Sequence, residues 1–306
     1  MLINTLLLIS SVFCFKPDSD TLFWFREHPR FFEKYKELLV NIRNYYVTPA
    51  EAEEEFKAIM HELRRKYPNT LVPGEYIPLV FPLAGSNVSA VGGRRGNGYY
   101  VREFDLFNQS VSGSHPAHDI FIYDRDRDCI DDRRGQYVDV VSVGHGIVIA
   151  VEHDWQEGSI FRGGNYVWVY DLERGGLWYY AHNRISVVQS GQRVRPGDKL
   201  GEVGRTGFNA AQNRSDTHLH LMYLELDEDL YPHPVNYYEW LKDAETVYVS
   251  STAEKYTPPR NQLDYIRTKG KEIRKVTISR QLPLTLRVKA GDSGGTARSN
   301  KRYNRK

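Results

Sequence analysis

The chain has 306 residues and a mass of 35.5 kDa, which suggests about two domains with a real core and excludes a miniature disulfide scaffold. Hydrophobic residues make up 41% and charged residues 26%, as in ordinary globular proteins, so wholesale disorder is not expected. The net charge of +2 is unevenly spread, because residues 251–306 hold 15 basic and 4 acidic side chains (+11), which leaves −9 for residues 1–250. Because residues 1–250 are acidic overall, we do not expect them to bind a specific nucleic acid.

The amino terminus resembles an export signal. Residues 6–15 are apolar apart from two serines, and Lys16-Pro17 follows at once. Such a run is too short to cross a bilayer, which needs about 20 residues, but it suits the core of a signal peptide. We predict a signal peptide over residues 1–16 and export to the periplasm or cell envelope. A lipid anchor on Cys14 and a buried first strand or helix are the alternatives.

A helical hairpin is predicted within residues 20–72. Apolar residues recur there at steps of three and four, and Thr48-Pro49-Ala50-Glu51 forms a capping box with proline at the first helical position. We expect an element that covers the core and carries no chemistry. A second hypothesis, based on its position in the chain, is that it regulates access to a substrate groove. The apolar stripe of its first helix is Phe31, Tyr35, Leu38, Ile42 and Tyr45.

Short β-like runs separated by glycine-rich turns follow Pro73-Gly74, and they predict an antiparallel sandwich or barrel. No glycine-rich nucleotide-binding loop occurs among them. The last residues lose all periodicity, so we expect a basic tail over 251–306 that is at least partly disordered. The expected strands are 137–143, 146–151, 166–170, 177–181 and 219–226.

Histidines in the β region form three groups that could share one metal site. The first is His115-x-x-x-Asp119, the second is His182 at the end of an expected strand, and the third is His218-Leu219-His220. Residues two apart in a strand point to the same side, so His218 and His220 share a face. Two imidazoles and one carboxylate around zinc leave a fourth position for a water, as in catalytic sites. A further imidazole nearby could transfer a proton or stabilise an oxyanion.

The order of these motifs resembles the lysostaphin and LytM-type zinc metallo-endopeptidases, which hydrolyse peptidoglycan peptides. The similarity includes the strand, glycine turn and strand around Gly144-His145-Gly146, and it covers about half of the chain. It extends to a G-x-x-V-x-x-G-x-x-[IL]-G-x-x-G-x-[ST]-G segment that ends at Gly207. The resemblance implies a LytM-like antiparallel β domain, here residues 76–245, of the duplicated hybrid motif type. It also implies Zn²⁺ held by His115, Asp119 and His220, with His182 and His218 as catalytic imidazoles.

One position departs from the family pattern, and one acidic run suggests a second metal site. His118 stands where many members have glycine, so it could compete with His115 for the metal, although a strand would turn the two side chains to opposite faces. The acidic run from Asp124 to Asp132 invites a calcium site. However, Cys129 stands where a calcium-binding EF-hand loop needs glycine, so an exposed charged hairpin is the favoured interpretation.

The sequence therefore predicts a zinc endopeptidase that hydrolyses amide bonds in the cross-link peptides of peptidoglycan. One alternative is a catalytically silent envelope protein that binds wall peptides or activates another hydrolase, and the presence of all five site residues argues against it. A second alternative, a sugar-transport phosphocarrier, is disfavoured by the aspartate of the first motif. The basic tail could contact anionic wall polymers or a membrane surface.

Overall fold

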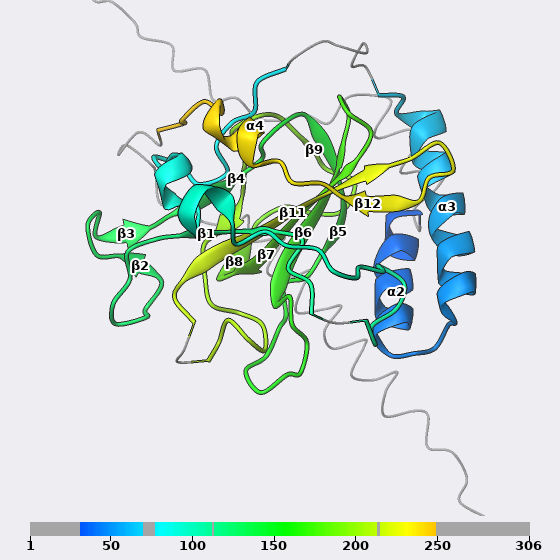
Figure 1. The fold of residues 1–306 in the computed structure, drawn as a ribbon, viewed down its shortest axis with the longest axis horizontal. Helices are drawn as coiled ribbons and strands as arrows, with labels where there is room; N and C mark the ends of the chain where they lie inside the picture. Colours follow the sequence, from blue (N-terminus) through cyan, green and yellow to red (C-terminus); the bar gives the residue numbers. More distant parts are fainter. Residues whose placement is uncertain (1–30, 70–76, 112, 213–214, 249–306) are drawn as a thin grey trace, which may run out of the picture. The chain divides into compact units, whose positions relative to one another are not determined.

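The computed structural model describes residues 31–69, 77–111, 113–212 and 215–248 (Figure 1). The predicted signal peptide, Cys14 and the basic tail lie outside these residues. None of the described helices is long and apolar enough to cross a membrane. The helices are α2 (Phe31–Arg43), α3 (Pro49–Lys66) and α4 (Tyr238–Lys242). The strands are β1 (His118–Phe121), β2 (Ile130–Asp131), β3 (Gln136–Tyr137), β4 (Asp139–Val141), β5 (Gly146–Val151), β6 (Asn165–Asp171), β7 (Leu177–Asn183), β8 (Ile185–Ser186), β9 (Arg193–Val194), β10 (Lys199–Glu202), β11 (His218–Leu226) and β12 (Pro232–Pro234).

The strands form one large sheet, one small sheet and a short two-stranded ribbon. The large sheet has the order β1-β11-β7-β6-β5-β9, with β12 added along β11, and the small sheet has the order β4-β10-β8. All the ladders between these strands are antiparallel. The predicted fold class, a mainly β antiparallel sandwich preceded by a helical hairpin, is confirmed.

The two faces of the large sheet belong to different cores, because side chains alternate along each strand. On β11, Leu219, Leu221 and Tyr223 join the core shared with the small sheet, while Met222 and Leu224 join the core under the helical hairpin. We call these the inner and outer faces. The inner core is dominated by β-branched residues of β4, β5 and β6, which pack well on pleated surfaces.

One strand prediction was wrong in its extent. The run 137–143 was expected as a single strand, but Tyr137 ends β3 in the two-stranded ribbon and Asp139 begins β4 in the small sheet. Val138 lies between them and is buried. Its carbonyl oxygen accepts a hydrogen bond from the Val203 amide at 3.0 Å. The chain therefore changes sheets within a run whose composition alone looks uniform.

The helical hairpin packs on the outer face. Thr48 caps α3 through the predicted reciprocal bonds with Glu51, with Pro49 in the first turn. Tyr35 of α2 lies edge-on to Trp168 of β6, with ring centroids 5.9 Å apart. The Lys36 ammonium also donates to the Val151 carbonyl at 2.7 Å. The apolar stripe predicted for the first helix is buried in this contact except at Tyr45, which is exposed just beyond the helix end.

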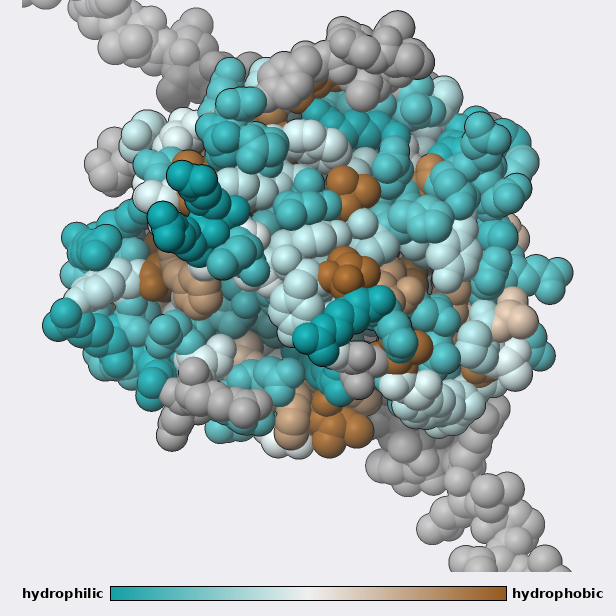
Figure 2. Space-filling view, in the orientation of Figure 1, coloured by the Kyte–Doolittle hydropathy of each residue, from teal (hydrophilic) through white to brown (hydrophobic). Residues whose placement is uncertain are grey.

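The face of the molecule seen in Figure 2 is mostly hydrophilic, and its hydrophobic side chains form separate small groups.

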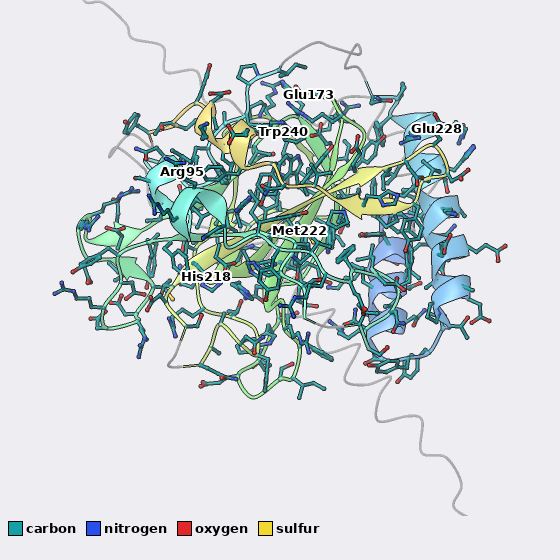
Figure 3. All side chains as sticks on the ribbon, viewed as in Figure 1. Arg95, Glu173, His218, Met222, Glu228 and Trp240 are labelled. Carbon is teal, nitrogen blue, oxygen red and sulfur yellow. The ribbon has the colours of Figure 1, made fainter. Side chains whose placement is uncertain are left out.

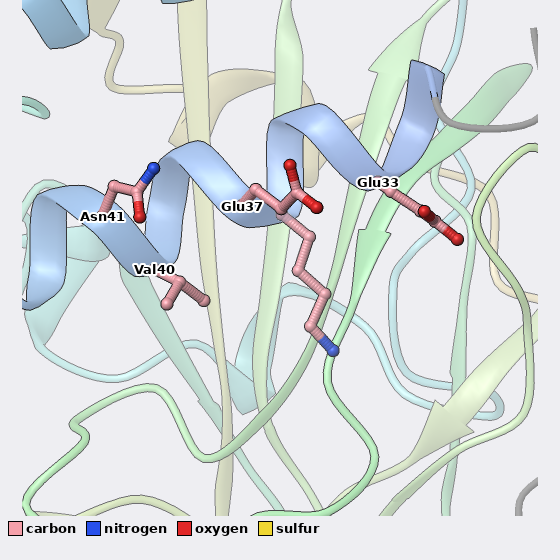
Figure 4. A pocket seen from close by; sticks show the side chains of 5 residues that line it. Glu33, Glu37, Val40 and Asn41 are labelled. Carbon is pink, nitrogen blue, oxygen red and sulfur yellow. The ribbon is translucent and has the colours of Figure 1, made fainter. Parts of the chain in front are cut away.

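A pocket lies along α2 and is lined by Glu33, Lys36, Glu37, Val40 and Asn41 (Figure 4). Its lining contains none of the five predicted site residues. This pocket is therefore separate from the predicted metal ligands and catalytic histidines.

The packing of α2 on the sheet predicts opposite effects for two substitutions at Tyr35, whose ring is buried but whose hydroxyl has no hydrogen-bond partner among the described residues. Tyr35→Ala should lower the free energy of unfolding by about 3–5 kcal/mol, as for other large aromatic truncations. Tyr35→Phe should leave it unchanged or raise it, because it removes an unsatisfied buried polar group. Urea unfolding of both variants measures this. An equally large loss in both would contradict the packing described.

Candidate metal and catalytic site

Three side chains predicted as metal ligands converge at one end of the outer face. One donor atom from each of His115, Asp119 and His220 lies within 4.8 Å of the others. Asp119 Oδ1 is 3.2 Å from His115 Nε2 and 3.0 Å from His220 Nδ1. Segments separated by about a hundred residues in the chain thus meet around one carboxylate oxygen.

Strand pairing explains this convergence. Asp119 of β1 is the direct antiparallel partner of His220 on β11, so the two side chains lie side by side on the same face. His115 precedes β1 and is held by a bridge to Tyr100, whose amide and carbonyl exchange hydrogen bonds with it at 3.0 and 2.8 Å. The bend between His115 and the strand lets the imidazole turn back toward Asp119.

His218 lies one step beyond His220 on the same face of β11, as the alternation predicted. Its Nε2 is 3.6 Å from Asp119 Oδ1. Figure 3 shows His218 at the end of the strand remote from the helical hairpin, with Met222 between that end and the helices. β11 therefore carries the site at one end and the hairpin contact at the other.

His182 joins the group through an unusual backbone conformation. Ala181 pairs with His220, so regular alternation would send the His182 side chain to the inner face. Instead, His182 has φ of +67°, a left-handed conformation that is costly for a residue with a side chain and that tends to occur at functional sites. Its ring centroid lies 5.0 Å from that of His218 and 5.5 Å from that of His220.

The loop beside His182 leaves no room for a side chain. A Cβ added at Gly207 would lie 2.9 Å from His182 Nδ1 and 2.2 Å from the Arg162 carbonyl oxygen, and Gly207 has φ of +103°. Glycine is needed there for both reasons. This gives the last glycine of the predicted motif a specific role in holding the wall of the site.

Three backbone carbonyls orient three of the imidazoles. The Nδ1 atoms of the rings lie 2.9, 2.8 and 2.7 Å from these oxygens. Since a carbonyl oxygen can only accept, each of these Nδ1 atoms carries a proton. In a neutral ring, Nε2 is then left with its lone pair toward the site. The pairs are His115 with Gly98, His182 with Thr206, and His218 with Asp216.

Burial sets the charge of the two histidines that are not predicted ligands. Desolvation, together with the neighbouring His218 and His220 rings, holds the pKa of His182 well below its ordinary value. Desolvation also lowers the pKa of His218, although Asp119 opposes this. Both rings are therefore neutral at pH 7 and can accept a proton at Nε2.

The carboxylate remains ionised. Burial alone would raise the pKa of Asp119, but hydrogen bonds from His115 and His220 hold it below its ordinary value. The same bond to Asp119 outweighs the effect of burial on His115 and raises the pKa of that imidazole. Asp119 is thus the negatively charged member of the three predicted ligands.

This donor set fits zinc. Two imidazole nitrogens and one carboxylate oxygen are a usual zinc ligand set, and ligand atoms about 2.0–2.1 Å from a tetrahedral ion lie about 3.3 Å apart. The 3.2 Å and 3.0 Å separations around Asp119 Oδ1 are close to that spacing. The Gly98 carbonyl also fixes the tautomer of His115 from outside, as second-shell partners of metal-bound histidines do.

His118 is not part of this group. It is buried, its Nε2 lies 3.0 Å from Asn236 Oδ1, and its Nδ1 has no partner among the described residues. Its ring is surrounded by Tyr99, Tyr237 and Tyr238 at centroid distances of 5.0–5.7 Å. The alternation along β1 turns it away from Asp119, so it has no access to the ligand position.

The acidic run does not provide a free carboxylate cage. Atoms of Asp124, Asp126 and Asp128 lie close together, but both oxygens of Asp124 already accept backbone amides of its own loop. Asp126 and Asp128 are exposed on the same turn. The segment is a turn between β1 and β2, which do not pair, and Asp124 is buried, so the exposed charged hairpin favoured from the sequence is found only in part.

The helical hairpin stands beside the site and does not bury it. The side chains of His115, Asp119 and His220 remain 25%, 26% and 20% exposed. An aromatic row links the two regions, since Tyr179 lies 6.3 Å from His220 and 4.5 Å from Trp168 between ring centroids. The described helices thus form one side of the space above the sheet and leave the ligand atoms accessible.

Part of the β region matches a known protein family. Residues 128–232 match the model of peptidase family M23. This segment contains His182, His218 and His220, and it begins after His115 and Asp119. No curated protein matches the chain.

Solved structures with a similar arrangement include three bacterial proteins. The lytM protein of Ruminococcus gnavus is 25% identical, with 44% of this chain and 49% of that one covered and a TM-score of 0.32. Lysostaphin from Staphylococcus simulans is 20% identical, with 60% of each chain covered and a TM-score of 0.33. A zinc-containing peptidase from Vibrio cholerae is 22% identical, with 44% of this chain and 31% of that one covered and a TM-score of 0.27.

The chain spans about half the length of the first of these proteins, and all three TM-scores are too low to support an inference about function. Residues 128–232, about a third of the chain, match the model of peptidase family M23, and the predicted resemblance to the lysostaphin and LytM-type peptidases is confirmed.

Proposed function

We propose that this protein is a zinc-dependent endopeptidase that hydrolyses amide bonds in the cross-link peptides of peptidoglycan. The observation that carries the proposal is the meeting of His115, Asp119 and His220 beside two neutral histidines, in a chain whose β region matches a peptidase family. The substrate class follows from the resemblance to the lysostaphin and LytM-type enzymes. Peptidoglycan lies in the cell envelope, so we place the action of the protein there.

In the proposed mechanism, the ion would be held by His115 Nε2, Asp119 Oδ1 and His220 Nδ1. Zinc, when bound, polarises the substrate carbonyl and makes a water nucleophilic near neutral pH. The neutral His182 and His218 rings present Nε2 lone pairs to the same space, so either can take a proton from the attacking water. The imidazolium formed can then donate its Nε2 proton to the leaving amine or hydrogen-bond the developing oxyanion.

The electrostatic arrangement supports this division of roles. The three ligands combine one negative charge with two imidazoles, which suits a divalent cation. His182 and His218 have no carboxylate hydrogen-bonded at Nδ1, only the backbone carbonyls of Thr206 and Asp216. A carbonyl partner fixes the tautomer without adding a full charge, which keeps these rings available as bases. No observation favours the alternative of a catalytically silent binding protein.

Zinc content should separate ligands from neighbours. Asp119→Ala and His220→Ala should lose bound zinc, with a larger drop in affinity than the roughly 10–100-fold typical of second-shell changes. His118→Gln is the matched control from the same motif and should keep a full equivalent, because its ring faces Asn236 and the tyrosines. Elemental analysis of folded, purified variants after dialysis provides the measurement. Loss of zinc in His118→Gln with retention in His220→Ala would refute the ligand assignment.

Turnover should separate the two remaining histidines from the ligands. His182→Ala and His218→Ala should keep zinc but lower kcat by about 10²–10⁴-fold, the range for loss of a general acid or base. Release of peptide fragments from a soluble cross-linked substrate measures kcat. If either variant loses zinc together with activity, that residue is a ligand and the proposed roles are wrong.

Digestion of purified cell-wall material tests the reaction itself. Walls with several cross-link types should be incubated with the protein, with a chelator, and with the chelator followed by added zinc. We expect new amino termini and fragment masses from one class of cross-link, loss of cleavage with chelator and recovery with zinc. Absence of cleavage from every wall type by zinc-loaded, folded protein would overturn the proposed function.

A further inference from the structure

A buried hydroxyl adjoins His218 and links two distant parts of the chain. Thr217 is fully buried, and its Oγ1 donates to Asp124 Oδ2 at 2.5 Å. The same oxygen accepts from Arg205 Nη1 at 3.2 Å. Thr217 therefore joins the acidic turn to the loop that leads into β11, at the residue directly before a proposed catalytic imidazole.

Asp124 is held rigidly on its own side of this contact. Its Oδ1 accepts from the amides of Arg127 and Asp128 at 2.7 and 3.2 Å, and its Oδ2 accepts from the Cys129 amide at 2.9 Å. The Asp124 side chain is 8% exposed. A carboxylate fixed by three backbone donors offers Thr217 an acceptor at a defined position.

Arg205 braces the other side. Its Nη1 donates to the Ser215 carbonyl at 2.7 Å and its Nη2 to the Gln212 carbonyl at 3.0 Å, so one guanidinium ties together the loop that precedes β11. The planar fork of arginine suits such multiple contacts better than a lysine does. Arg205 thereby links Gln212, Ser215 and Thr217 in the segment that leads into β11.

Each half of this arrangement is next to a carbonyl that orients a histidine. Arg205 directly precedes Thr206, whose carbonyl accepts from His182 Nδ1 at 2.8 Å. Thr217 directly follows Asp216, whose carbonyl accepts from His218 Nδ1 at 2.7 Å. A shift of either residue would move the carbonyl beside it and rotate the imidazole that depends on it.

We propose that Asp124, Thr217 and Arg205 form a positioning network that sets the orientation of His218, and through Thr206 that of His182. These residues act through the carbonyl anchors and do not contact the substrate. The proposal rests on the proposed peptidase function, and it assigns to the acidic turn a role in the site that its charge pattern does not suggest. Small displacements of catalytic groups can cost about 10²-fold in rate, so the network should be visible in kcat.

Two substitutions at Thr217 test this in the full chain. Thr217→Val keeps the shape but removes the hydroxyl, and Thr217→Ser keeps the hydroxyl. With zinc-loaded protein and a soluble cross-linked peptide, we expect Thr217→Val to lower kcat by about 10²-fold with little change in KM or zinc content, and Thr217→Ser to restore most of the rate. If the network of Asp124, Thr217 and Arg205 had a purely structural role, Thr217→Val would change the midpoint of unfolding and leave kcat of the folded protein unaltered.

A spectroscopic measurement keeps the test independent of turnover. In ¹H–¹⁵N spectra of the imidazole groups, the His218 Nδ1 proton should be protected from exchange by its bond to the Asp216 carbonyl in the native protein and in Thr217→Ser. That protection should be lost in Thr217→Val. If Thr217→Val does not fold, Arg205→Lys, which keeps the charge but not the fork, should show the same loss.

The outcomes distinguish the two proposals. A wild-type protein that cleaves no wall peptide, but whose His218 signal depends on the Thr217 hydroxyl, would overturn the proposed function and support the network. An active wild-type protein with equal kcat and equal His218 protection in folded Thr217→Val and Thr217→Ser would overturn the network alone.

Discussion

The side-chain alternation of β11 is the constraint on which the rest of the structure depends. One face of this strand joins the inner core through Leu219, Leu221 and Tyr223, and the other carries His218, His220 and Met222. Because the period is two, a one-residue slip would place leucines at the site and histidines in the core. The burial of the inner face therefore fixes the position of the imidazoles.

The hairpin and the site share the outer face, and this makes them parts of one structural unit. Outer-face residues of β5, β6, β7 and β11 share one core with α2 and α3, whereas the histidines lie at one end of β7 and β11, where the ligand side chains are partly exposed. The hypothesis that the hairpin regulates access remains a prediction, but the described helices contribute a large share of the outer core. Removal of the whole hairpin would therefore expose that core as well as the groove, and small substitutions on α2 are the cleaner probe.

Many features of the fold and of the candidate site could be predicted from the sequence, because they depend on local residue patterns. The capping box at Thr48 and the shared face of His218 and His220 follow from helix and strand patterns. The order of the three histidine motifs then indicated that these distant segments form one site, which periodicity alone cannot predict. The boundary between β3 and β4 at Val138 was not predicted, because the residues on both sides of it have the same strand-like composition.

The features that escaped prediction belong to the backbone or to tertiary contacts. The left-handed conformation of His182 and the carbonyls of Gly98, Thr206 and Asp216 have no side-chain signature. The acidic run around Asp124 suggested a choice between a calcium loop and a solvated turn, because carboxylate spacing does not reveal which oxygens are already bonded to amides. Only the folded chain connects that turn to Thr217.

The proposed function depends on a single divalent ion bound by His115, Asp119 and His220. Diffraction from crystals grown with zinc, measured on both sides of the zinc absorption edge, locates such an ion directly. We predict one anomalous peak about 2.0–2.2 Å from His115 Nε2, Asp119 Oδ1 and His220 Nδ1, with no fourth protein ligand. A peak at the acidic turn instead, or an ion whose remaining position is filled by His182 or His218, would contradict it.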